Sequence, residues 1–178
     1  MQVRVANLTL EVMQGDISRQ QDMDAVVNAA NAQLLPGGGV AGAIHRAAGP
    51  DLAEACRPLA PIAPGEAVIT PAFNLPNRHV IHCLGPVYGQ DRPEAELLAR
   101  CYQRALALAD EHQLESVAFP AISAGAFGYP LEQALHIAAN TLVKYGRDAG
   151  SVARIRMVLF DEQARALFER VLEKILES

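Results

Sequence analysis

The chain has 178 residues, a length that predicts a single domain covering residues 1–178. Hydrophobic residues make up 51% of the chain and charged residues 20%, which excludes an intrinsically disordered protein. The net charge of −5 and the lack of any Lys/Arg run argue against a nucleic-acid-binding protein. No apolar stretch reaches the ~20 residues of a membrane helix, and the N-terminus alternates like a strand instead of forming a signal-peptide core. We therefore expect a soluble, cytoplasmic protein with no membrane partner.

The first half of the chain alternates short strands with turns rich in glycine, proline and asparagine. Leu8, Leu10 and Val12 alternate with polar residues, as in a strand with one buried face. The apolar run AVVN has polar residues on both sides, which is typical of a buried strand. Strands are expected at 2–6, 8–14, 25–28, 66–70 and 79–83, and helices at 41–48 and 51–57.

The second half alternates strands with longer amphipathic helices. Leu98, Cys101, Ala105 and Leu108 fall on one face of a helix predicted for 94–112. Strands are expected at 116–120 and 154–160, and helices at 131–145, with Pro130 at the first helical position, and at 161–176. Strands that alternate with helices require an α/β layered sandwich with parallel strand pairs, to which the N-terminal hairpin adds an antiparallel pair.

Three cysteines, Cys56, Cys83 and Cys101, lie far apart and form no CxxC motif. An odd number of cysteines without paired spacing argues against both a disulfide framework and a structural zinc site. We expect buried, reduced thiols and no bound metal.

Two glycine-rich loops each follow a predicted strand and precede a helix. GGGVAG (37–42) formally matches GxGxxG, but its glycines begin too far after the strand for a Rossmann dinucleotide site. Successive glycines still let a ligand approach the backbone, and a helix N-terminus favours an anion. SAGAFG (123–128) repeats the arrangement. The two loops either hold a diphosphate between them at the carboxyl edge of the sheet, or are ordinary connections.

Polar residues near the predicted strand ends are further candidates. Asp16 either caps a short helix at 17–22 or accepts a hydrogen bond from an exocyclic amine such as adenine N6. Asn28 and Asn31 carry the donors and acceptors that suit ribose hydroxyls, although loop-stabilising turns are the alternative. His45 lies near the first glycine loop, where a packed histidine is favoured over a general base.

Taken together, the motifs closely resemble those of the macrodomain family. They are GDI (15–17), DAVVNAAN (24–31), GGGVAGAIHRAAGP (37–50), VIHCLGP (80–86) and FPAISAGAFGYP (119–130), and the resemblance spans residues 8–160 in the family's order. Macrodomains bind ADP-ribose, and many hydrolyse ADP-ribose derivatives. The resemblance implies a three-layer α/β/α sandwich with a mixed, mostly parallel sheet of about six strands.

The resemblance also implies a role for each motif. Asp16 would hold adenine N6 beside the Ile17 amide, and Phe160 would line the adenine and its ribose. The two glycine loops would wrap the diphosphate, while Asn31 and Phe127 would position the distal ribose for catalysis. Motifs and resemblance together give these candidate ligand-binding residues: Asp16, Ile17, Asn28, Asn31, Gly37, Gly38, Gly39, Val40, Ala41, Ser123, Ala124, Gly125, Ala126, Phe127 and Phe160.

One residue departs from the pattern of many hydrolytic macrodomains, because Ala41 stands where they have an aspartate proposed to activate water. Similar viral macrodomains with GGGVAG are hydrolases, whereas some members with alanine there are known chiefly as binders. We predict hydrolysis of mono-ADP-ribosyl esters, on Asp or Glu of proteins or in O-acetyl-ADP-ribose, with the substrate's diphosphate orienting the water. The partners are then ADP-ribose and ADP-ribosylated proteins or small molecules, without a cofactor. The alternatives are a non-catalytic ADP-ribose reader and a phosphatase acting on ADP-ribose 1″-phosphate.

Overall fold

The computed structural model describes residues 1–148 and 150–178, whose strands form one seven-stranded sheet. The strands are β1 (Gln2–Val5), β2 (Leu8–Gln14), β3 (Ala25–Ala29), β4 (Ala67–Pro71), β5 (His79–Cys83), β6 (Ser116–Phe119) and β7 (Arg154–Leu159). Their order across the sheet is β1-β2-β7-β6-β3-β5-β4. The central pairs are parallel, and the outer pairs, β1 with β2 and β4 with β5, are antiparallel. The predicted mixed, mostly parallel sheet is confirmed, with seven strands instead of about six.

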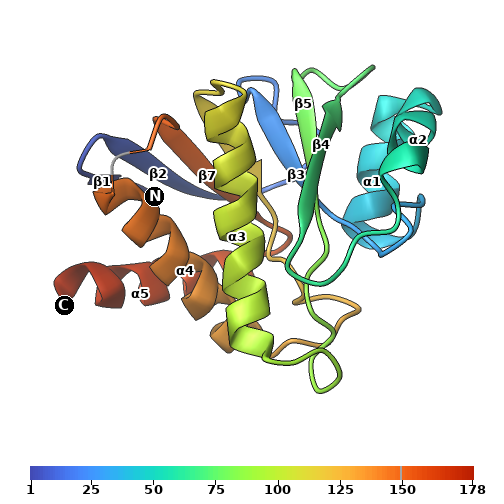
Figure 1. The fold of residues 1–178 in the computed structure, drawn as a ribbon. Helices are drawn as coiled ribbons and strands as arrows, with labels where there is room; N and C mark the ends of the chain where they lie inside the picture. Colours follow the sequence, from blue (N-terminus) through green and yellow to red (C-terminus); the bar gives the residue numbers. More distant parts are fainter. Residues whose placement is uncertain (149) are drawn as a thin grey trace.

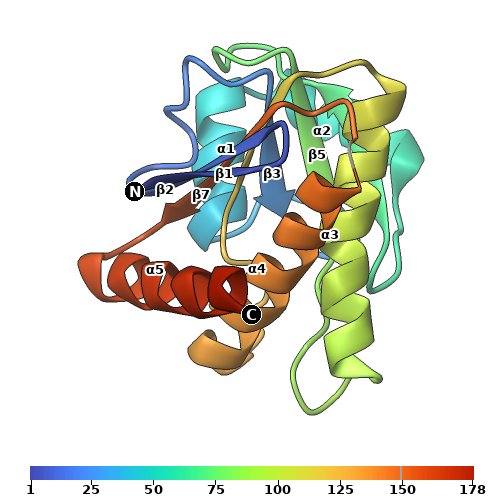
Figure 2. The same ribbon diagram turned by 90° about the vertical axis from the view of Figure 1, so that its left-hand side faces the viewer.

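Helices cover both faces of this sheet, which confirms the three-layer sandwich (Figures 1 and 2). Helices α1 (Gly39–Ala48) and α2 (Asp51–Cys56) pack on one face, and a 3₁₀ turn, η1 (Arg57–Leu59), follows them. Helices α3 (Glu94–Glu111), α4 (Leu131–Arg147) and α5 (Glu162–Glu177) pack on the other face.

Two hydrophobic cores result, one on each face of the sheet. Val26 contributes to the core under α1 and α2, whereas its neighbour Val27 contributes to the core under α3, α4 and α5. This division follows from the alternation of side chains along a strand. The central strands β3 and β6 are buried on both faces, which explains their continuous apolar sequences.

Several element boundaries differ from the predicted ones. Helix α1 begins two residues early, at Gly39, whose φ of +57° lies in the left-handed region that favours glycine. Pro130 is the N-cap of α4 and not its first helical residue. The alternative short helix at 17–22 is wrong: this segment is a turn, in which the Asp16 carboxylate accepts hydrogen bonds from the Ser18 amide (2.9 Å) and hydroxyl (2.7 Å).

The three cysteines are buried and unpaired, as predicted. Burial raises the pKa of Cys56 to about 11 and that of Cys101 to about 12, so both remain protonated at neutral pH. No helix in residues 1–148 and 150–178 is both long enough and apolar enough to cross a membrane.

Candidate functional site

A cavity of about 840 Å³ opens where the parallel strands β3, β6 and β7 end. Its lining includes Ala29 from the end of β3, Pro120 just after β6 and Leu159 from the end of β7. Carboxyl ends of parallel strands meet at one edge of the sheet, which is where open α/β folds bind their ligands. The volume lies within the range of small-molecule sites, roughly 300–1,000 Å³.

The structure brings almost all the sequence-predicted candidates together around this cavity. Those that line it are Asp16, Ile17, Asn31, Gly37, Gly38, Gly39, Val40, Ala41, Ser123, Ala124, Gly125, Ala126, Phe127 and Phe160. The prediction missed Gly15, Ala29, Ala30, Ala43, Gly85, Pro120, Ala121, Ile122, Val158 and Leu159. Most of the missed residues lie at or just after strand ends, so a rule that counts every residue at the carboxyl edge would have found them.

Asn28 is the exception, because its side chain does not line the cavity. It points to the same face of the sheet as Val26, beneath α1, and is 1% exposed. Its Nδ2 lies 3.1 Å from Nδ1 of His82, the residue paired with it in β5, and Nε2 of His82 lies 3.0 Å from Oγ1 of Thr70. The alternation along β3 turns this amide into the core, so the cavity lining gives no support to the predicted contact between Asn28 and a ribose.

His45 lies on the buried side of α1 and does not line the cavity either. It is 7% exposed, and burial lowers its pKa below the ordinary value of 6.5. Burial also lowers the pKa of His82 to about 3, with a smaller contribution from the charge of His45. The structure therefore supports the packed histidine that the sequence favoured over a general base.

The segment before the first glycine loop is held by Asn31. Its Nδ2 donates to the Leu35 carbonyl oxygen and its Oδ1 accepts from the Leu35 amide, both at 2.9 Å. A Cβ on Gly37 would lie 3.7 Å from the same Nδ2. The Asn31 side chain thus fixes the loop that leads into the glycines and retains a second N–H for a ligand.

The first glycine loop packs tightly against the helix that follows it. A Cβ on Gly42 would stand 2.3 Å from the carbonyl oxygen of Gly37, a separation that real Cβ atoms essentially never show. The N-cap of α1 is Gly38, which offers no side-chain cap. The first residues of this helix line the cavity, and no capping side chain competes for their amides, as anion-binding helix N-termini require.

The second glycine loop is held against the segment after β5. The Ser123 hydroxyl donates to the Pro86 carbonyl oxygen at 2.8 Å, and the Tyr88 amide donates to the Phe127 carbonyl oxygen at 2.9 Å. Gly85 must be glycine because a Cβ there would overlap the Ser123 hydroxyl. Since the Ser123 hydroxyl is already bonded within the protein, this loop offers mainly backbone groups to a ligand.

The cavity lining contains one ionisable side chain, Asp16, and two other polar side chains, Asn31 and Ser123. Hydrogen bonds from Ser18 hold the pKa of Asp16 below its ordinary value of 3.8, helped by the positive charges of Arg19 and Arg46. Asp16 is therefore ionised at neutral pH and can accept a hydrogen bond from an amine. Phe160, 73% exposed, places a flat apolar ring at the same end of the cavity.

Comparison with known proteins agrees with this geometry. A family model described as Macro domain matches residues 27–138. A macro domain-containing protein of Ralstonia nicotianae is 45% identical over 171 residues, covering 96% of this chain and 98% of that protein. A protein of Klebsiella pneumoniae named O-acetyl-ADP-ribose deacetylase is 47% identical over 167 residues, covering 91% and 95%.

Comparison with solved structures likewise finds similarity to macrodomains. The Oceanobacillus iheyensis macrodomain with ADP superimposes with a TM-score of 0.96 at 39% identity, covering 99% of this chain and 96% of the other. The Trypanosoma brucei macrodomain in complex with ADP-ribose gives a TM-score of 0.83 at 36% identity, covering 94% of this chain and 68% of the other.

Proposed function

The chain belongs to the macro domain family, and on that premise we propose that its cavity binds ADP-ribose and hydrolyses mono-ADP-ribosyl esters to free ADP-ribose. The observation that carries this proposal is the pair of glycine loops that line the same cavity, with Asp16 at the adenine end and Asn31 beside the first glycine loop. Adenine lies at Asp16, Ile17 and Phe160, the diphosphate lies between the loops, and the distal ribose lies at Asn31 and Phe127.

Backbone amides hold the diphosphate in this arrangement. Among residues 1–148 and 150–178, no Lys or Arg lines the cavity, so the described lining offers no side-chain cation to neutralise the phosphates. The uncapped start of α1 supplies amides and the positive end of the helix dipole instead. Asp16 is kept at the adenine end, away from the phosphates it would repel.

The chemistry proceeds without a protein base, because the one ionisable lining residue, Asp16, is assigned to the adenine. A water held by the diphosphate attacks the ester carbonyl carbon and passes its proton to a phosphate oxygen. The bond between the acyl carbon and the ribose oxygen then breaks, and that oxygen takes the proton, giving a carboxylic acid and ADP-ribose. Asn31 and Phe127 hold the ribose for this attack, and loop amides stabilise the developing oxyanion.

The names of relatives support an ester substrate, since several are named O-acetyl-ADP-ribose deacetylase. The test is to incubate the protein with O-acetyl-ADP-ribose and measure free ADP-ribose and acetate, and separately to incubate it with a protein mono-ADP-ribosylated on glutamate and measure free ADP-ribose and the unmodified protein. Equal amounts of both products, formed over many turnovers, support the proposal.

Ala41 favours a second candidate function, a reader that binds ADP-ribosylated proteins without turnover. It lines the cavity at the start of α1 and has no group that activates water. Tight binding of ADP-ribose, with no ADP-ribose formed from either ester, would select the reader. Release of inorganic phosphate from ADP-ribose 1″-phosphate, with both esters intact, would instead select a phosphatase.

A further inference from the structure

A second cavity, of about 470 Å³, adjoins the adenine end of the cleft. It lies between the turn after β2, the exposed side of α1 and the loop that connects β4 to β5. Asp16 and Ala43 line both cavities, so the two are continuous there. We call this second cavity the arginine groove, because Arg19 and Arg46 form its charged walls.

The arginine groove is positively charged on a chain whose net charge is −5. Its lining contains two arginines against one aspartate, Asp16. Nε of Arg19 lies 3.7 Å from Oδ2 of Asp16, and both arginines contribute to the lowered pKa of that carboxyl. Asp16 also accepts two hydrogen bonds from Ser18, so its charge is partly compensated before any ligand arrives.

Arg46 reaches back along α1 toward the glycine loop. Its Nη1 would lie 3.0 Å from a Cβ on Gly42, the residue one helical turn before it. Long side chains on a helix lean toward its N-terminus in this way. The exposed guanidinium therefore lines the groove and reaches toward the residue at the base of the first glycine loop.

The adenosine ribose of the proposed ligand lies at the mouth of this groove. With adenine at Asp16 and the diphosphate at the start of α1, the ribose between them runs past Ala43, which lines both cavities. Arg46 follows Ala43 by three residues, so both lie on the same face of α1, about 4.5 Å apart along its axis. A group attached to the ribose hydroxyls would enter the groove directly.

We propose that the arginine groove is an anion subsite for a phosphate group attached to the adenosine ribose of the ligand. The planar guanidinium forks of Arg19 and Arg46 match phosphate oxygens, and Asn74 adds an amide from the opposite wall. Such a phosphate occurs either directly on the ribose, as a monoester, or beyond one further ribose, in the next unit of an ADP-ribose chain. The inference rests on the proposed binding of ADP-ribose in the main cleft.

Calorimetry with three ligands tests the subsite: ADP-ribose, ADP-ribose 2′-phosphate and a two-unit ADP-ribose chain. The proteins are the wild type, Arg19→Gln, Arg46→Gln and the double variant. Glutamine keeps hydrogen-bonding capacity but removes the charge. We expect at least one of the larger ligands to bind about tenfold tighter than ADP-ribose to the wild type, as one charge-assisted hydrogen bond provides. The ratio of the affinity for the larger ligand to the affinity for ADP-ribose should fall toward one in Arg46→Gln and in the double variant. In the wild type this affinity ratio should shrink at high salt.

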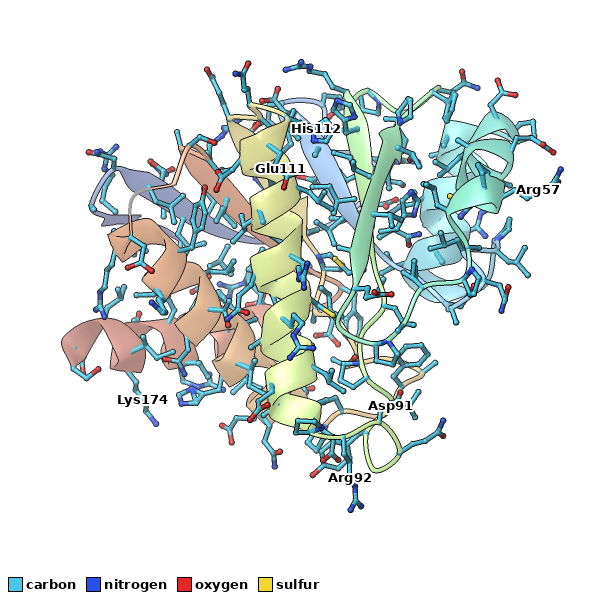
Figure 3. All side chains as sticks on the ribbon, viewed as in Figure 1. Arg57, Asp91, Arg92, Glu111, His112 and Lys174 are labelled. Atoms are coloured by element: carbon cyan, nitrogen blue, oxygen red, sulfur yellow. The ribbon has the colours of Figure 1, made fainter. Side chains whose placement is uncertain are left out.

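Arg57→Gln is the matched control. Arg57 is also an exposed arginine, paired with Glu54 at 2.9 Å, and it projects from the outer end of α2 (Figure 3). It lines neither the main cleft nor the arginine groove. The ratio should therefore stay at its wild-type value in this variant.

The outcomes separate the subsite from the proposed function. A gain for the monoester alone, for the chain alone or for both supports the subsite and identifies the source of the phosphate, provided that the double variant loses the gain. Equal affinity for all three ligands in the wild type, or a gain that survives in the double variant, overturns the subsite while ADP-ribose binding stands. Failure of ADP-ribose itself to bind overturns the proposed function and the subsite with it.

Discussion

Replacing Gly42 with alanine should move the first glycine loop without unfolding the protein. The added Cβ would stand 2.3 Å from the carbonyl oxygen of Gly37, so the two must separate by at least 0.7 Å to reach the 3.0 Å below which such contacts are essentially absent. Helix α1 is anchored in the core by Ile44 and Ala48, so the exposed loop is the part that yields.

The expected losses of turnover and of stability follow from that displacement of the loop. A misplacement of about 1 Å can cost roughly 100-fold in rate, so we expect turnover of an ADP-ribosyl ester to fall roughly 10- to 100-fold. The steric conflict costs about 1–3 kcal/mol of stability, and the better helix propensity of alanine offsets about 1 kcal/mol of it. The net loss of stability is then at most about 2 kcal/mol, which leaves the protein folded.

The assay combines thermal melting, calorimetric titration with ADP-ribose and initial rates with O-acetyl-ADP-ribose. Gly146→Ala is the matched control, because its Cβ would lie 2.9 Å from Cδ2 of Leu8 and 3.1 Å from Cγ1 of Val5, in the core on the other face of the sheet. That variant should lower the melting temperature and leave affinity and rate unchanged. Wild-type affinity and rate in Gly42→Ala would refute the argument that the loop position controls the site.

Three further changes test other parts of the site. Asp16→Ala should weaken ADP-ribose binding by about 1.5–3 kcal/mol in calorimetry, whereas Asp16→Asn should lose less affinity because it keeps an acceptor for Ser18. Equal affinity in the wild type and both variants would remove Asp16 from the adenine site. Asn31→Ala should lower kcat for O-acetyl-ADP-ribose far more than it weakens ADP-ribose binding, and equal losses would leave Asn31 a binding residue only. Because burial lowers the folded-state pKa of His82 to about 3, the unfolded state binds its proton first as the pH falls below 6.5. As the pH falls, the free energy of unfolding should therefore decrease by about 1.4 kcal/mol per pH unit from this residue alone. Urea titrations at several pH values between 6 and 4.5 should show that the unfolding free energy of His82→Gln depends less on pH than that of the wild type.

The motifs predicted the site well because they are local. Each glycine loop follows a strand and precedes a helix in the sequence itself, and parallel strands bring such loops to one edge of the sheet. The two glycine loops are therefore expected to face one crevice, and the resemblance to macrodomains adds the Asp16 turn to it. The layers of the fold followed equally directly from the alternation of strands and helices.

What the sequence did not predict depends on contacts between segments. The strand-end position of Asn28 predicts either a ribose ligand or a loop-stabilising turn, but the direction of its side chain depends on which face of β3 lies under α1. The antiparallel pairing of β4 with β5 has no hairpin signal, since a seven-residue connection at 72–78 separates the strands. A further feature, the arginine groove, arises only when the turn after β2, the helix α1 and the loop from β4 to β5 fold against each other.

The pH dependence of kcat for O-acetyl-ADP-ribose tests the central claim most directly. The cleft lining contains no group that titrates between pH 5 and 8, because Asp16 is its one ionisable side chain and its pKa lies below 3.8. A substrate that supplies its own base through the diphosphate should therefore be hydrolysed with a kcat that is flat across this range. A sigmoidal or bell-shaped profile with an apparent pKa between 5 and 8, or no turnover at any pH despite tight binding of ADP-ribose, would contradict the account.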